Sequence, residues 1–302
     1  MKHDLNVTAV IISVFFLTQI VGLFLVNKDI SSVQEINGTI IIQHQDTSVG
    51  PRPETTGFES FLYIAVAVFI GTILILIIMK YGKIKLWKTW FFMAVFFAIS
   101  ISLGVLMDST LAFFFAFIFA SLKIIKRNVL IHNFTEVLMY SGLAVLLAPI
   151  FDLFWAFMLL LVISIYDMYA VWKSKHMIKM AKFQAKSKLF AGLMIPYEEK
   201  KGIRLEIPQK PDLMPKKKKV RNAILGGGDV AFPLIFSAVV MENLIKQGVS
   251  STLAFFQTTI ISVTVTIAIL GLFVFAKKEK FYPAMPIVTL GCVIGYLIVL
   301  AF

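Results

Sequence analysis

The sequence has very little cysteine and very little charge for its length. Its single cysteine, Cys292, lies in an apolar run, which excludes an intramolecular disulfide and a cysteine metal cluster. Charged residues make up only 15% of the 302 residues and hydrophobic residues 59%, whereas soluble domains carry about 25% charged residues. The mean hydropathy is +0.87. This composition excludes an ordinary soluble globule, a disordered chain and a secreted disulfide scaffold, and it predicts a polytopic helical membrane protein.

Nine apolar runs can cross a bilayer, whose core needs about 20 residues of helix. We therefore predict an all-α membrane protein with nine transmembrane helices. The runs are Leu5–Val26, Phe58–Met79, Trp87–Met107, Ser109–Leu122, Asn133–Phe151, Leu153–Trp172, Ala223–Leu244, Thr252–Ala276 and Phe281–Phe302. The fourth run is short, and only a tight turn around Asp108 separates it from the third. The first run is too long for the core of a signal peptide and is interpreted as an uncleaved anchor.

The predicted organisation is one integrated membrane domain with a long polar insertion. A six-helix region covers residues 1–172, a basic inner-side loop covers 173–222, and a three-helix region covers 223–302. Lysines at positions 175, 179, 182 and 186 share one helical face, which favours a basic helix on the membrane surface. A solvated loop explains the same charges. Further along, the alternation in Ile203–Ile207 predicts one strand.

Basic residues lie almost entirely on one side of the predicted bilayer. If the N-terminus is inside, only Lys28, Arg52 and Lys246 of the 29 Lys and Arg residues lie outside. Because Lys and Arg are enriched in cytoplasmic loops, this distribution sets the orientation. It predicts a multi-pass protein of the cell membrane, with the N-terminus and the 173–222 loop in the cytoplasm and the C-terminus outside. The net charge of +12 is thus a topology signal, and no nucleic-acid partner is expected.

Two aspartates lie inside predicted spans, where a charged side chain is costly and therefore informative. Asp167 lies six residues before Lys173, the inner end of the sixth span, and Asp229 lies eight residues after Arg221, the inner start of the seventh. At 1.5 Å per residue, both lie about 9–12 Å from the inner boundary. Consecutive antiparallel helices therefore bring the two acids to the same level.

Two neighbouring carboxyl groups in a low-dielectric site cannot both ionise easily, so they share one proton. The ionised group can act as a general base on water while the protonated group donates to a scissile carbonyl. This chemistry needs neither a metal nor a cofactor, and none is expected. By contrast, Glu136 and Glu242 lie near span ends, and we expect them to be solvated or paired.

Two further motifs accompany the aspartates. The glycines Gly226–Gly228 remove every side chain beside Asp229, which lets a neighbouring helix or a substrate backbone approach. Tight helix packing through small residues is an equally good interpretation. Pro233, one turn later, indicates a kinked or broken helix. The segment Tyr282–Pro286 contains two prolines at the start of the last span, and such irregular backbone is tolerated at this depth only inside protein or beside water.

Together these motifs resemble the presenilin and signal peptide peptidase family of intramembrane aspartyl proteases. The resemblance covers the nine-span plan and is strongest from Leu153 to the C-terminus. It implies an endopeptidase that hydrolyses peptide bonds within or near transmembrane segments, with membrane proteins as substrates. It implies catalytic roles for Asp167 and Asp229, and supporting roles in the active site or in substrate binding for Tyr166, Gly226, Gly228, Pro283, Ala284 and Met285. Met285 replaces the leucine of the family motif, a change close in volume.

The large hydrophilic loop of eukaryotic presenilins is missing, so the chain resembles a compact archaeal-type homologue. Signal peptide peptidases resemble presenilins turned over in the membrane, and the lysine distribution here implies the presenilin sense. The expected substrates are therefore single-span proteins with their N-terminus outside. The Ile203–Ile207 strand either accepts the extended substrate segment by β-augmentation or is a loop strand with no partner. A homo-oligomer is possible.

The alternative function is a proton- or cation-coupled transporter or a leak channel, which also uses paired acids and broken helices. The first five spans contain no counterpart of the Gly-Gly-Gly-Asp element, which disfavours an inverted-repeat transporter. A prepilin-type peptidase shares the Gly-x-Gly-Asp motif but lacks the motif on a ninth span.

Overall fold

The computed structural model describes residues 5–36, 38–55, 57–126, 128–173, 180, 183–184, 187, 189–198, 220–276 and 282–302. The helices in this part of the chain are α1 (Leu5–Asp29), α2 (Phe58–Lys80), α3 (Ile84–Gly104), α4 (Ser109–Ile125), α5 (Val129–Leu147), α6 (Leu153–Met168), α8 (Gly227–Lys246), α9 (Ser251–Phe275) and α10 (Met285–Val299). Short helical turns, η1 (Ala148–Ile150) and η2 (Tyr169–Lys173), extend α5 and α6. Two antiparallel hairpins pair β1 (Ile30–Ile36) with β2 (Thr39–His44), and β3 (Gly192–Glu198) with β4 (Val220–Gly226).

These helices confirm the predicted nine-span architecture. Seven of the described helices are long and apolar enough to cross a membrane, and α4 and α10 are apolar but shorter, at 17 and 15 residues. The tight turn before α4 has a specific cause, because the Asp108 side chain accepts the N–H groups of Thr110 and Leu111 at 3.0 and 3.2 Å. Asp108 is therefore an N-cap that starts a new helix immediately after the preceding one ends.

The prediction that the seventh helix begins at Ala223 is wrong. Residues 220–226 form β4, and α8 begins at Gly227. Ala223 and Leu225 are buried, whereas Ile224 between them is 45% exposed, which is the two-residue period of a strand. β4 also runs across residue 222, where we placed the boundary of the inner loop. The predicted strand Ile203–Ile207, and most of the predicted basic helix, lie outside the described residues.

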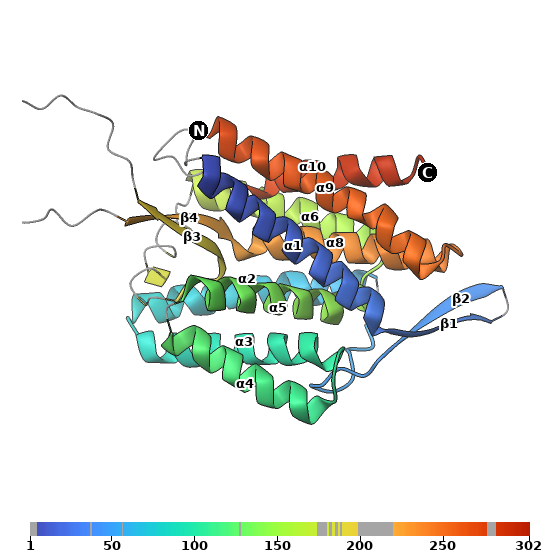
Figure 1. Ribbon diagram of the computed structural model, residues 1–302, viewed down its shortest axis with the longest axis horizontal. Helices are drawn as coiled ribbons and strands as arrows, with labels where there is room; N and C mark the ends of the chain where they lie inside the picture. The colour runs from blue at the N-terminus through green and yellow to red at the C-terminus, as the bar shows by residue number, and fades with distance from the viewer. Residues whose placement is uncertain are drawn as a thin grey trace, which may run out of the picture.

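Helix α8 lies at the centre of the bundle (Figure 1) and contacts α1, α5, α6, α9 and α10. Fifteen of its 20 residues are buried, against three of the 23 in α2. Pro233 removes one N–H from the helix ladder, but α8 continues through it to Lys246 and is not broken there. The Gln19 side chain of α1 donates to the nearby Val230 carbonyl at 3.0 Å. The element that carries Asp229 is therefore the most enclosed part of the fold.

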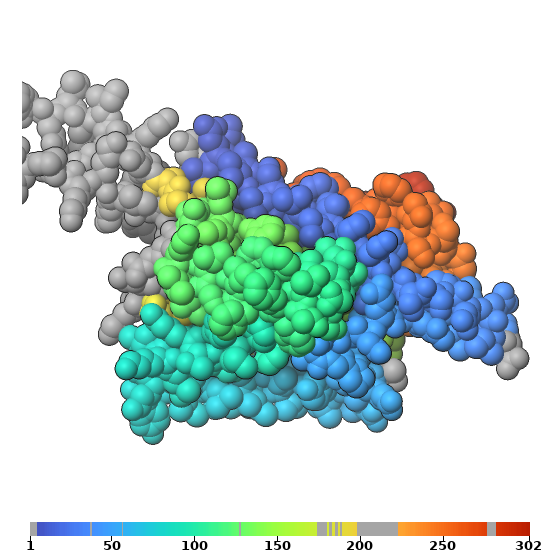
Figure 2. All heavy atoms as spheres, turned by 60° about the horizontal axis from the view of Figure 1, so that its bottom comes forward, coloured from blue at the N-terminus to red at the C-terminus, as the bar shows by residue number. Residues whose placement is uncertain are grey.

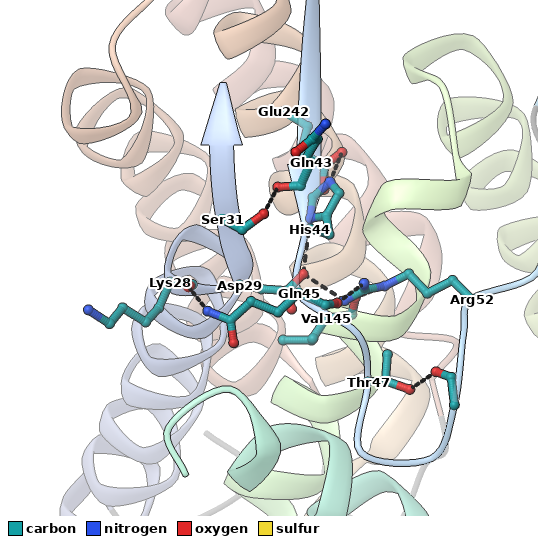
Figure 3. A network of polar contacts seen from close by, with 11 residues as sticks. Lys28, Asp29, Ser31, Gln43, His44, Gln45, Thr47, Arg52, Val145 and Glu242 are labelled. Atoms are coloured by element: carbon teal, nitrogen blue, oxygen red, sulfur yellow. Dashed lines mark hydrogen bonds and ion pairs between the residues drawn. The ribbon is translucent and has the colours of Figure 1, made fainter. Parts of the chain in front are cut away.

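The β1–β2 hairpin projects beyond the ends of the helices (Figure 1 and Figure 2). A polar network attaches its base to the bundle (Figure 3). Asp29, at the end of α1, accepts Arg52 Nη2 at 2.6 Å and His44 Nδ1 at 3.0 Å. Arg52 also donates to the Val145 carbonyl of α5, and His44 Nε2 lies 3.7 Å from Glu242 Oε2 of α8. Glu242 is therefore buried beside His44 rather than solvated, and its Oε1 has no hydrogen-bond partner among the described residues.

Candidate active site

Asp167 is the next-to-last residue of α6, where the helix passes into the π-turn η2. Its side chain is buried, and Oδ2 accepts the Met285 N–H at 3.2 Å, while the Ala284 N–H also donates to the carboxylate. Both donors lie at the start of α10, where N–H groups have no helical acceptor and carry partial positive charge. Pro283 and Pro286 have no N–H, so this segment offers its two intervening donors to Asp167.

A second contact fixes the start of α10 against α6. Ser164 lies one turn before Asp167, and Thr289 lies one turn after Met285. Their hydroxyl oxygens are 2.7 Å apart in a buried hydrogen bond. Because a buried polar pair away from water has no alternative partners, this bond holds the two helices in register. The sixth span and the proline-containing segment of the ninth span, 118 residues apart, are therefore brought together as one unit.

Asp229 is the third residue of α8, and its side chain is also buried. Its carboxylate accepts the Gly226 N–H, which is the reach-back bond of a helix capping box. The charge of Asp167 acts directly on the Asp229 carboxyl. The fold therefore places two acids at adjacent ends of α6 and α8, each held by backbone N–H groups at the start of a helix.

The three glycines before Asp229 have different surroundings. A Cβ atom on Gly226 would lie 3.0 Å from Asp229 Oδ2, and one on Gly227 would lie 2.5 Å from Tyr140 Oη. A Cβ on Gly228 would approach no atom closer than 3.4 Å, and Gly228 is exposed. Close packing thus accounts for the first two glycines, whereas the position of the third is exposed and borders only Phe232. The packing interpretation is supported at Gly226 and Gly227, and the approach of a substrate at Gly228 stays a prediction.

Tyr166, to which the resemblance assigns a supporting role, makes a contact with another helix. Its hydroxyl donates to Thr72 Oγ1 of α2 at 3.4 Å. Tyr166 therefore connects α6 with α2, the most exposed long helix of the bundle. The structure brings Asp167, Asp229, Gly226, Gly228 and the Pro283–Met285 segment to one place, and it links Tyr166 to the neighbouring helix.

Sequence reasoning missed Tyr140 of α5. Its side chain is 2% exposed, and its hydroxyl lies near Glu136 and Asp229 without a well-formed hydrogen bond to any described residue. Glu136 is fully buried, and it forms an ion pair with Lys123 at 2.6 Å. Of the two states expected for it, solvated or paired, the structure shows the paired one. The only sequence signal was the spacing of Glu136 and Tyr140, which are four residues apart and share a helix face.

The sequence matches, over residues 21–302, the profile of a family described as signal-peptide peptidase, presenilin aspartyl protease. This chain belongs to that family. The protease is also similar to solved structures of a presenilin family intramembrane aspartate protease. The structure in space group C222 has a TM-score of 0.60 and 15% sequence identity, and the match covers 97% of this chain and 98% of that chain. The structure in space group P2 has a TM-score of 0.57 and 15% identity, and the match covers 96% of each chain. At this identity the likeness shows the fold. No curated protein sequence matches the chain.

Family membership confirms the resemblance and the activity class predicted from the motifs. The protein is a multi-pass membrane hydrolase, an intramembrane aspartyl protease that acts on transmembrane proteins within the bilayer. The comparisons give no support to the transporter or leak-channel alternative.

Proposed function

We propose that Asp167 and Asp229 are the catalytic pair of this protease. The observation that carries the proposal is their common arrangement: two buried carboxyl groups that act on each other, each bound by backbone N–H groups at a helix start. Neighbouring carboxyls in such a site share one proton. One member can therefore accept a proton while the other donates one, as peptide hydrolysis without an acyl-enzyme requires.

In the proposed reaction, the ionised carboxylate removes a proton from water as the water oxygen attacks the scissile carbonyl carbon. The protonated carboxyl donates to the carbonyl oxygen, which gives a neutral gem-diol. Collapse of the gem-diol breaks the C–N bond: the nitrogen takes the proton that the general base received, and one gem-diol hydroxyl returns its proton to the carboxylate that had donated one, which regenerates the pair. The backbone N–H groups of Gly226, Ala284 and Met285 keep the two carboxyls oriented throughout.

The substrate must be extended near this pair, because a helix hides its amides in internal hydrogen bonds. The proposed docking site is β4, which leads directly into α8 and so ends three residues before Asp229. A substrate strand that pairs beside Ile224 would continue past the exposed Gly228 toward the two carboxyls. β4 thus takes the role that we first assigned to the Ile203–Ile207 segment.

The proposed orientation rests on the distribution of charge. The start of α1 and the β3–β4 hairpin lie at one end of the bundle, and β1–β2 lies at the other (Figure 1). With most Lys and Arg residues at the β3–β4 end of the spans, that end faces the cytoplasm and the C-terminus lies outside. The proposed substrates then have their N-terminus outside. A reporter that works only in the cytoplasm, fused to the C-terminus, should be inactive. Activity of that fusion would contradict this orientation.

The catalytic assignment is tested with Asp167→Asn and Asp229→Asn, which keep the side-chain shape but cannot exchange the proton. The purified variants are incubated with a single-span substrate, with and without a peptide mimic carrying a hydroxyl at the scissile position. Both variants should lose cleavage, and the mimic should inhibit the wild-type protein. Asp46→Asn, at an exposed acid of the β1–β2 end, is the matched control and should cleave normally. Cleavage by either active-site variant contradicts the assignment.

A further inference from the structure

The β3 strand has one edge paired with β4 and the other edge against α5. In an antiparallel pair, the N–H and C=O groups of alternate residues face the partner strand or face away from it. Gly192 and Met194 bond to α5 through both of their backbone groups, so these residues face away from β4. By the same alternation, Pro196 is the next residue on that outer edge.

Three side chains of α5 reproduce the bonds that another strand would make. Asn133 donates from Nδ2 to the Met194 carbonyl and accepts the Met194 N–H at Oδ1, both at 3.0 Å. At Gly192, His132 Nε2 donates to the carbonyl at 2.8 Å, and Glu136 Oε2 accepts the N–H at 3.1 Å. Both outward-facing residues therefore have every backbone group satisfied by side chains of one helix.

Pro196 and a buried charge pair reinforce the covered part of this edge. Pro196 has no N–H, so it cannot donate to an added strand. Glu136, which is buried, is neutralised by Lys123 at 2.6 Å, and Lys123 Nζ also donates to Thr135 Oγ1 at 3.0 Å and to the His132 carbonyl at 3.5 Å. All three ammonium protons thus have acceptors. A buried charge pair with full hydrogen bonding is a rigid anchor rather than a labile contact.

Among the described residues, α5 side chains do not cover the outer edge of β4 in this way, although the Gly226 N–H at the end of this edge donates to Asp229. Ile224 pairs with Met194, and since the groups of Met194 face α5, those of Ile224 face the opposite edge of the hairpin. The Ile224 side chain is 45% exposed. An open strand edge is a template for an added strand, and proteins block the edges they do not use.

We propose that His132, Asn133 and Glu136 are positioning residues that close the β3 edge, so that an extended substrate can pair only with β4, beside Asp229. This inference rests on the proposed function and deepens it. The three residues touch neither substrate nor the reacting atoms; they decide which edge of the hairpin accepts the substrate. Loss of this cover should let substrate pair at a second edge, farther from the carboxyls, and the set of cleaved bonds should broaden.

The first test is Asn133→Ala in the full-length protein. Amide hydrogen exchange without substrate should show the Met194 amide exchanging about fivefold to tenfold faster, because it has lost its acceptor. With a single-span substrate, mass spectrometry should show additional cleavage positions and kcat should fall. Leu130→Ala, at a 79% exposed residue of the same helix, is the control and should change neither result.

Two milder variants cover the case in which Asn133→Ala fails to fold. Asn133→Asp keeps the acceptor for the Met194 N–H and loses only the donor to its carbonyl. Pro196→Ala restores an N–H on the β3 edge without altering α5. Each should broaden the cleavage positions while the thermal midpoint stays near the wild-type value. If both variants fold and give the wild-type products, the inference is overturned. It is also overturned if Asn133→Ala speeds the exchange of the Met194 amide but leaves the cleavage products unchanged.

The two proposals fail separately. Cleavage by Asp167→Asn would refute the catalytic pair, whereas the exchange experiment uses uncleaved protein without substrate and does not depend on which residues are catalytic. A wild-type Met194 amide that exchanges like an exposed amide refutes the closed edge even if both aspartates are essential.

Discussion

Gly227→Ala tests the contact between α8 and α5 beside the active site. The new Cβ would lie 2.5 Å from Tyr140 Oη and 3.2 Å from Cζ, so the ring must move or α8 must shift. At an open helix position, Ala would instead be favoured over Gly by about 0.5–1 kcal/mol. Because overpacking a buried site costs about 1–3 kcal/mol, we expect Gly227→Ala to be destabilised by about that amount and to lose cleavage as Asp229 is displaced.

Tyr140→Phe should largely correct this defect. The hydroxyl forms no well-aligned hydrogen bond with any described residue, so the single change should cost less than about 1 kcal/mol. In the double variant, the nearest ring atom would be Cζ at 3.2 Å, which a small ring movement relieves. The coupling energy between the two changes should then be about 1–3 kcal/mol.

The assay is a double-mutant cycle that measures both the thermal midpoint in detergent and kcat/KM on one single-span substrate. The reasoning is refuted if Gly227→Ala alone matches the wild-type protein in both measurements. It is also refuted if Tyr140→Phe restores neither measurement in the double variant. A matched control is Gly71→Ala, since a Cβ there meets no atom within 4 Å, and it should leave the midpoint unchanged or raised.

Four further predictions concern the same bundle. Gly228→Ala should keep the thermal midpoint but lower kcat/KM at least about tenfold, since the methyl group occupies exposed space on the proposed path of the substrate; normal kinetics would show that no substrate lies there. Ser164→Ala should lower the unfolding free energy by about 1 kcal/mol by leaving Thr289 unpaired, and Thr289→Val added to it should give little further loss. Arg52→Gln should cost up to about 3 kcal/mol, because buried Asp29 loses its arginine partner at 2.6 Å and keeps only His44, and a midpoint equal to wild type would argue against this. Since catalysis needs one ionised and one protonated carboxyl, the cleavage rate should pass through a maximum as pH is varied, and a rate that rises steadily with pH would argue against a shared proton.

The sequence was sufficient for the number of spans, but not for where Asp229 lies in its helix, because residues 220–226 form a strand and α8 begins only at Gly227. A bilayer imposes a length of apolar helix and a cost on buried charge, and both are visible in a short window of residues. The same local logic led to Asp167 and Asp229 as a pair, to the helix start near Pro283 and to the family. It also predicted paired or solvated states for Glu136 and Glu242, and Glu136 is paired with Lys123.

Only the tertiary structure decided how the backbone around these acids is used. That the Ala284 and Met285 N–H groups bind Asp167, that residues 220–226 form a strand, and that Asn133 covers Met194 all depend on partners far away in the chain. In a helix each backbone N–H donates to the carbonyl four residues earlier, so a short stretch of sequence is enough to indicate the helix. A strand edge or a buried carboxylate takes its donors from whichever segment the packing brings near, and no local pattern specifies that segment.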